Sequence, residues 1–340
     1  MTEDARIGFC CTFQSPTGDG EEERRMNMRT TTIAFLKRQS PAEAFDRIAE
    51  IVAHNLDVLD NQLAYVAALP PLERMFRILS GIFPGFSHPD ISHYYADADL
   101  RRLIEARLAA AGAFARDGDV RLSMHPGQHA LLATARLDAL ANAIADIMEH
   151  VEIMEMLGYG GGWHPHGAHV NIHGGSGAVG IEGVRHGLSL LPESARNLVT
   201  IENDEMSFGL DDLLAVADET ALVVDFHHHW IFTRGEYLQP DDPRVDRVKA
   251  SWRGVRPAAH ISVSRESLVP HLPDDVAPDY AALGAEGFKA AALRGHSDMM
   301  WNRAVNDLVA RHLSWCDVEV EAKAKNLASA QLADHVRAMA

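Results

Sequence analysis

The chain has 340 residues, a length that allows one large or two medium domains. Of these residues 47% are apolar and 23% charged, which is typical of a globular protein. No apolar run is long enough to cross a bilayer, so the sequence predicts no membrane association. The formal net charge of -17 disfavours binding of nucleic acid, because affinity for the phosphate backbone rests largely on Lys and Arg.

Short β-type runs alternate with helical patterns along the chain. The polar residues 1–5 are expected to be flexible, and the Gly- and charge-rich segment 15–29 predicts a mobile loop. Amphipathic stretches separate most of the later strand candidates, and a last helix is expected over residues 326–340. The strand candidates are Arg6–Cys11, Met75–Ser80, Val120–His125, His169–His173, Leu198–Glu202, Ala221–His227, Ala258–Ser264 and Asp317–Glu321, and the clearest helical stretches are Pro41–Leu69, Asp97–Asp117, Thr134–Leu157, Asp279–Arg294 and Ser297–Ser314.

This alternation predicts βαβ units and a parallel sheet. Eight strands with helices between them favour a closed (β/α)8 barrel of the TIM type over an open sheet. We therefore expect a single α/β barrel domain over residues 1–340. Neither a Gly-rich dinucleotide fingerprint nor a phosphate-binding P-loop is present, so the sequence indicates no nucleotide cofactor.

Histidines and carboxylates stand at the carboxyl ends of the predicted strands two to eight, or in the connections after them. In a parallel barrel these ends converge on one rim, where barrel active sites lie. Imidazole and carboxylate ligands without Cys suit Mn²⁺, Zn²⁺ or Fe²⁺ rather than a structural zinc site, and they suffice for two or three ions that share carboxylates. The nine candidate ligands are His88, His125, His173, Glu202, Asp225, His228, His260, His296 and Glu321.

Each candidate also has a purely structural interpretation. A single histidine is more often a hydrogen-bonded core or surface residue than a ligand, and Glu202 or Asp225 could instead cap the helix that follows. In the run 227–229 strand alternation allows only some of the three imidazoles to face inward. His164 and His166 precede the fourth strand and His169 opens it, so we expect all three at the opposite rim. The coincidence of such residues at nearly every strand end favours the metal site.

The cellular compartment is indicated by the cysteines and the N-terminus. The three cysteines are odd in number and two are adjacent, which suits a reducing compartment better than a disulfide framework. Residues 1–6 lack the apolar core of a signal peptide. We therefore expect a cytoplasmic protein, and a monomer.

Several short motifs occur along residues 6–330. In chain order they are RIGF, FRILSGIFPGFSH, HPGQ, NIHGG, ENDE, DFHHH, HIS, HSD and EAKAKN. As a set, these motifs resemble those of the UV damage endonuclease family. The resemblance implies a β/α barrel related to endonuclease IV and xylose isomerase. It also implies a cluster of divalent metals, typically manganese with Zn²⁺, Mg²⁺ or Fe²⁺ as alternatives, that cuts a DNA strand on the 5′ side of a lesion.

Carried over residue by residue, the resemblance implies the same nine metal ligands. It places Glu202, His228 and Glu321 at the catalytic centre. It also implies that Gln128 and His129, which follow HPG, probe the damaged double-stranded DNA beside the lesion. The family commonly has an aromatic residue where this chain has His129.

A second difference lies on the seventh strand. The family usually has Lys at the position of Ala258, two residues before His260. Without that lysine the electrostatics of the metal site must differ, and Glu319, on the same strand face as Glu321, is the candidate for compensation.

Three functions are open on these grounds. The first is a metal-dependent hydrolase that cuts damaged DNA. The second is a metalloenzyme with the same centre and a non-DNA substrate, either a small molecule or a peptide, in which iron could act; the acidic charge and His129 favour it. The third is a metal-binding protein without turnover, which the retention of all nine ligand positions disfavours.

Overall fold

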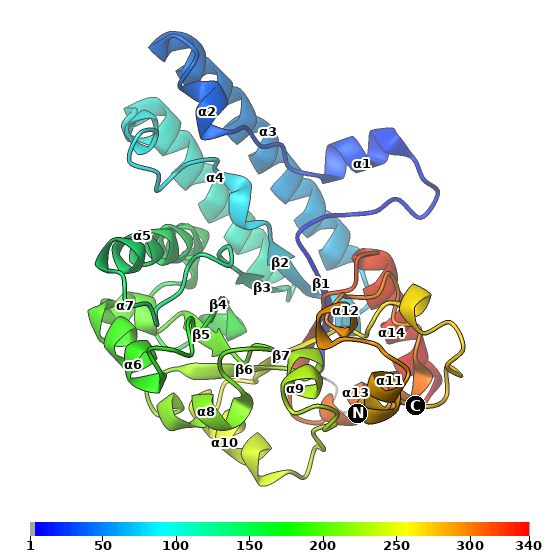
Figure 1. The fold of residues 1–340 in the computed structure, drawn as a ribbon. Helices are drawn as coiled ribbons and strands as arrows, with labels where there is room; N and C mark the ends of the chain where they lie inside the picture. The colour runs from blue at the N-terminus through cyan, green and yellow to red at the C-terminus, as the bar shows by residue number, and fades with distance from the viewer. Residues whose placement is uncertain (1–3, 340) are drawn as a thin grey trace.

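Eight parallel strands form a closed barrel in the computed structural model, which describes residues 4–339 (Figure 1). Each strand pairs with the next in chain order, and the last closes onto the first. The (β/α)8 prediction is therefore confirmed, with every strand inside or close to its expected range. The strands are β1 (Ile7–Cys10), β2 (Met75–Ile78), β3 (Arg121–Met124), β4 (His169–His173), β5 (Val199–Glu202), β6 (Ala221–Asp225), β7 (Ala258–Ile261) and β8 (Asp317–Val320).

Helices surround the barrel and bury the apolar faces of its strands. The longest, α3, would measure about 42 Å at 1.5 Å per residue and extends beyond the barrel together with α4 (Figure 1). None of the helices within residues 4–339 combines the length and apolarity needed to cross a membrane. The helices are α1 (Gly20–Met26), α2 (Ile33–Leu36), α3 (Pro41–Ala68), α4 (Ala98–Asp117), α5 (Leu137–Met154), α6 (Ile181–Leu190), α7 (Glu193–Arg196), α8 (Leu210–Leu213), α9 (Phe226–Phe232), α10 (Pro243–Ser251), α11 (Tyr280–Ala285), α12 (Ala290–Leu293), α13 (Arg303–His312) and α14 (Asn326–Ala338).

Local sequence signals explain where the long helices begin. Ser40 and Glu43 form a capping box at the start of α3, and Pro41 occupies its first turn. Asp97 caps α4 by accepting hydrogen bonds from two backbone N–H groups. The expected C-terminal helix over 326–340 is present as α14.

Three segments differ from expectation. The segment 15–29 was expected to be a loop but contains α1, whose N-terminus is capped by Asp19. The helix expected over 279–294 is split into α11 and α12, because Gly287 between them has a φ of +98° that ends a helix. The helix expected from Ser297 starts only at Arg303. Of residues 1–5, expected to be flexible, 1–3 lie outside the described residues and Ala5 is buried.

The interior of the barrel is polar, whereas barrels usually fill this space with Val, Ile and Leu. Near the amino ends of the strands, Asp317 is fully buried and pairs with Arg121 at 2.8 Å and Arg256 at 2.6 Å. Trp252 closes this end, with the guanidinium of Arg121 5.2 Å from its ring centre. His164 and His169 pack against Trp252, at the rim opposite to the candidate ligands, as the sequence predicted for His164.

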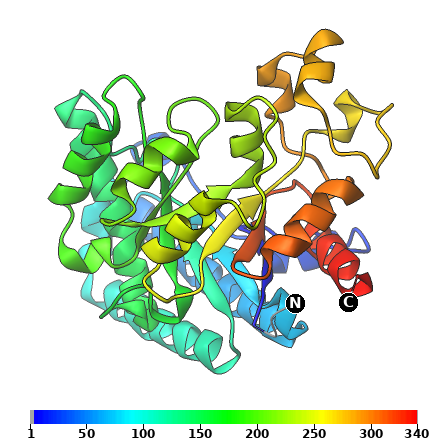
Figure 2. The same cartoon turned by 90° about the horizontal axis from the view of Figure 1, so that it is seen from below.

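The long connection from β7 to α13 carries α11 and α12 at one edge of the molecule (Figure 2). It returns to the rim through a β-bridge between Ser264 and His296. This bridge explains how a histidine 35 residues from the end of β7, counted from Ile261, reaches the carboxyl end of the barrel.

Candidate metal centre

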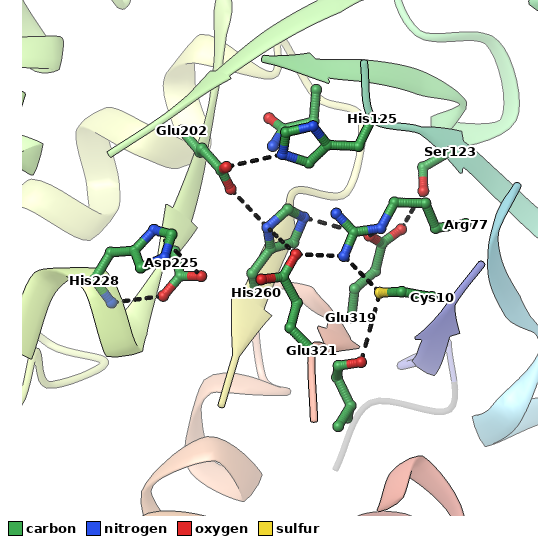
Figure 3. Close-up of polar contacts among 12 residues, drawn as sticks. Cys10, Arg77, Ser123, His125, Glu202, Asp225, His228, His260, Glu319 and Glu321 are labelled. Atoms are coloured by element: carbon green, nitrogen blue, oxygen red, sulfur yellow. Dashed lines mark hydrogen bonds and ion pairs between the residues drawn. The ribbon is translucent and has the colours of Figure 1, made fainter. Parts of the chain in front are cut away.

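Glu202, the last residue of β5, lies close to three histidines, which are His125 just after β3, His173 on β4 and His260 on β7. Figure 3 shows Glu202 with His125 and His260. Its Oε1 is 2.9 Å from His125 Nε2 and 3.1 Å from His173 Nδ1. Its Oε2 is 2.6 Å from Nδ1 of His260. The carboxylate is 1% exposed and does not cap the following helix, so the capping interpretation is wrong for Glu202.

Asp225 is the last residue of β6, and its side chain both caps a helix and belongs to the candidate metal site. Its Oδ1 accepts a hydrogen bond from the backbone N–H of His228 at 2.7 Å and so caps α9. Its Oδ2 lies 3.6 Å from His228 Nδ1 and has no hydrogen-bond partner among the described residues. Asn203 fixes the backbone of Asp225 by accepting from its N–H and donating to its carbonyl. One oxygen therefore shapes the helix while the other remains available to a ligand.

Glu321 follows β8 and completes the rim. Its Oε1 lies 3.4 Å from His260 Nδ1. His296 Nδ1 is 2.9 Å from the carbonyl oxygen of Glu321 and 3.9 Å from its Oε2. The ring of His296 is 6.1 Å from that of His228, so the long β7–α13 connection delivers its histidine to the same centre.

Seven of the nine predicted ligands fall into three groups whose ligand atoms lie within 4.8 Å of one another. Glu202 belongs to the first two groups and Asp225 to the last two, so these two carboxylates link the three groups in a row. Buried atoms of Glu202, Asp225 and His260 point into this space without a hydrogen bond of their own, which a cation would satisfy. The donor set thus fits two or three divalent ions. The groups are His125, His173, Glu202; Glu202, Asp225, His228; and Asp225, His260, Glu321.

The remaining predicted residues lie outside these groups. His296 adjoins Glu321, as described above. His88 is in the loop after β2, where its Nδ1 accepts a hydrogen bond from the N–H of Asp90 at 3.2 Å, and no contact within residues 4–339 joins it to the other ligands. Gln128 and His129 are exposed on the loop after β3, next to His125. In the run 227–229 it is His228 that reaches Asp225.

The carboxylates and histidines of the centre strongly shift one another's pKa values. Burial disfavours ionisation of Glu202, but His173, His260 and His125 outweigh it and hold the pKa of this carboxyl well below its ordinary value. Burial likewise opposes the charged form of His228, yet Asp225, with Glu202 and Glu321, raises its pKa to about 9. Metal ligation requires neutral imidazoles, so cations compete with protons for this site.

Arg77 and Ser123 are site residues that the strand-end argument missed. Arg77, on β2, is buried, and its guanidinium contacts the carboxylates of Glu319 and Glu321 (Figure 3). Ser123, on β3, donates a hydrogen bond to Glu319. A signal for Arg77 was present, because a charged residue within the apolar run MFRILS is unusual. Ala258 packs with Met75, away from these groups.

Comparison with known proteins shows the family of this chain. The family model for UV-endonuclease UvdE matches residues 5–340. The chain belongs to the UvdE family. Among its relatives, a UV DNA damage endonuclease of Bacillus cereus (strain B4264) is 26% identical over 321 residues, covering 92% of this chain and 90% of the relative. One from Deinococcus radiodurans is 27% identical over 255 residues, covering 73% and 77%.

A solved structure shares the fold. The crystal structure of SacUVDE matches 98% of this chain, and 99% of its own, with a TM-score of 0.74 and 20% sequence identity. This likeness shows that the UvdE-type barrel is conserved between the two chains. The resemblance drawn from the motifs is thereby confirmed for family and fold.

Proposed function

We propose that this chain is a metal-dependent endonuclease that hydrolyses the phosphodiester on the 5′ side of a lesion in double-stranded DNA. The observation that carries the proposal is a row of three candidate ligand groups on a barrel rim, in a protein that belongs to the UvdE family. Several cations close together suit phosphodiester hydrolysis, because they can activate water and stabilise the attacked phosphate when bound.

The residues of the rim have assigned roles in this proposal. Mn²⁺ is the favoured ion for the mixed His and carboxylate set, with Zn²⁺, Mg²⁺ or Fe²⁺ as alternatives. Glu202 and Glu321 remain ionised at neutral pH, because neighbouring positive groups lower the pKa of both carboxyls. As carboxylates they can hold the cations and accept a hydrogen bond from the attacking water, and His228 completes the catalytic centre as a neutral ligand. His88 and His296 are proposed as the outermost ligands.

Gln128 and His129 are proposed to contact the damaged duplex. Both side chains are exposed on the loop after β3, shortly after the proposed ligand His125 in the sequence. An imidazole can stack on a base, although it offers less apolar area than Tyr or Phe. We also propose that the enzyme is a cytoplasmic monomer, in agreement with three cysteines that are all free thiols.

A non-DNA substrate is the second candidate. The net charge of -17 supports it, because a duplex is usually gripped by Lys and Arg that neutralise its phosphates. In that case the same centre would act on a small molecule or a peptide, with iron as a possible ion.

The two functions are separated by a nicking assay. Protein loaded with Mn²⁺ should cut a UV-irradiated duplex and spare the same duplex without irradiation. His125→Ala should lower the rate at least about 100-fold, whereas His186→Ala, at an exposed position on α6, should leave it unchanged. Failure to cut with Mn²⁺, Mg²⁺, Zn²⁺ or Fe²⁺, together with no binding to DNA at low salt, would refute the DNA substrate. Elemental analysis that finds iron and a coloured, redox-active centre would favour the second candidate.

A further inference from the structure

Glu319 is a buried carboxylate that the proposed reaction does not use. It lies on β8 inside the barrel, one layer below Glu321, and is 0% exposed. Its Oε1 accepts a hydrogen bond from Ser123, and its Oε2 lies 3.3 Å from Arg77 Nε and 3.3 Å from His260 Nε2 (Figure 3). Burying a charge is costly, so a carboxylate at this position calls for a function.

The position of Glu319 is fixed by the pairing of β8 with both of its neighbouring strands. The register pairs Glu319 with His260 on β7 and with Gly8 on β1. Arg77 reaches from β2 across β1 to the carboxylates of Glu319 and Glu321. This guanidinium offsets the buried negative charge, which would otherwise be strongly destabilising.

His260 faces a different partner with each ring nitrogen. Nδ1 is directed at the metal centre, 2.6 Å from Glu202 Oε2 and 3.4 Å from Glu321 Oε1. Nε2 is directed away from it, toward Glu319 Oε2. Within residues 4–339 neither Nε2 nor Oε2 makes a hydrogen bond. Nε2 lies 3.3 Å from Oε2, and Arg77 Nε balances the charge of that oxygen from the same distance. An imidazole can offer Nδ1 to a cation only while its single proton is on Nε2.

We propose that Glu319 is a positioning residue of the metal centre: it holds the Nε2 proton of His260 and so directs the Nδ1 lone pair toward the cations. The inference rests on the proposed metal function, and Glu319 acts through His260 without touching ion or substrate. A carboxylate behind a ligating histidine fixes its tautomer and orientation and raises its basicity. In this chain the carboxylate is supplied by the strand next to the histidine, with Arg77 balancing its charge.

Metal binding tests the proposal without DNA. Glu319→Gln keeps the shape of the side chain but removes the charge that holds the proton. Calorimetric titration with Mn²⁺ should show an affinity about 10- to 100-fold below wild type. Glu319→Asp keeps a carboxylate, drawn back by one methylene, and should lie between the two. Glu73→Gln is the matched control, since it makes the same change at another buried carboxylate, which pairs with Arg337 at 2.7 Å and is not part of the site, and its affinity should stay close to wild type.

A second readout separates positioning from a general loss of structure. With Co²⁺ in place of Mn²⁺, loss of a nitrogen ligand changes the visible absorption bands, and Glu319→Gln should show this change while its circular dichroism matches wild type. A folded Glu319→Gln with wild-type affinity and spectrum would overturn the proposal. If Glu319→Gln does not fold, Glu319→Asp decides, and wild-type affinity in that variant would overturn it equally.

The outcomes also separate this inference from the proposed function. Wild-type protein that binds Mn²⁺ tightly but does not cut irradiated DNA would refute the DNA substrate and leave the role of Glu319 intact. Wild-type protein that cuts DNA, with Glu319→Gln binding Mn²⁺ normally, would refute the role of Glu319 alone. Wild-type protein that binds no divalent ion would refute both.

Discussion

Glu149 on α5 carries a carboxyl group that the fold buries without an ion pair within residues 4–339. It is 8% exposed, and its Oε2 accepts a hydrogen bond from the backbone N–H of Ser87 at 3.0 Å. Burial raises the pKa of Glu149 from the ordinary 4.5 to about 7, and the negative charges of Asp146 and Glu152 add to the effect. The group therefore titrates in the folded chain at a pH where the unfolded chain has already lost its proton.

The sign and size of the effect follow from this difference. Between pH 4.5 and 7 the folded chain binds a proton that the unfolded chain does not, so Glu149 makes the protein less stable as pH rises. The pKa of Glu149 in the folded chain exceeds the ordinary pKa by 2.5 (7 minus 4.5), which corresponds to a loss of about 3 kcal/mol in the free energy of unfolding once pH exceeds both values. Glu149→Gln removes the titration but keeps an oxygen for Ser87. We expect the variant to equal wild type near pH 4.5 and to be about 3 kcal/mol more stable at pH 8.

Urea denaturation followed by tryptophan fluorescence at several pH values measures this difference. Glu152→Gln is the matched control, because Glu152 is on the same helix but is more exposed and pairs with Arg101 at 2.6 Å. Its loss should cost no more than about 1 kcal/mol at pH 8, with the opposite sign. A gap between Glu149→Gln and wild type that stays constant from pH 4.5 to 8 would show that burial does not perturb Glu149, and the reasoning would be refuted.

Packing and metal binding give further expectations. Gly112→Ala should lower the unfolding free energy by about 3 kcal/mol in thermal denaturation, because a Cβ there would lie 1.7 Å from the Leu157 carbonyl oxygen; Gly284→Ala meets nothing within 4 Å and should be neutral or stabilising. Asp225→Asn should reduce the Mn²⁺ bound per chain by at least one, measured by elemental analysis, since Asp225 belongs to two of the three groups; unchanged stoichiometry would contradict the shared carboxylate. Mn²⁺ at 100 times its Kd should stabilise the wild type by about 2.7 kcal/mol per site, and EDTA should reverse the gain.

The strand order and the rim could be read from the sequence because both depend on local patterns. Each of the eight strands is a short β-type run, and position at a strand end is a property of neighbouring residues. His125, Glu202 and Asp225 could therefore be assigned to one rim before any distance was known. The same locality explains the errors: composition alone marked 15–29 as a loop, and periodicity alone carried a helix through Gly287.

The tertiary structure decided which side chains contact one another. Barrel closure brings β8 beside β1 and places the carboxylates of Glu319 and Glu321 within reach of Arg77 on β2. No pattern within one strand contains that contact, since it depends on residues more than 240 positions apart. The structure likewise selected His228 from its run, through the cap that Asp225 forms on α9.

By itself, the sequence determined that a β/α barrel would present histidines and carboxylates at one rim. Only the structure showed that Glu202 and Asp225 are each shared between two of the three candidate ligand groups, because membership of a group depends on distances across the barrel. It also turned Glu319 from a candidate for charge compensation into a side chain with a definite neighbour, Nε2 of His260. The physical reason is that a strand fixes the direction of its own side chains, whereas the partner of a buried charge is fixed by closure of the whole sheet.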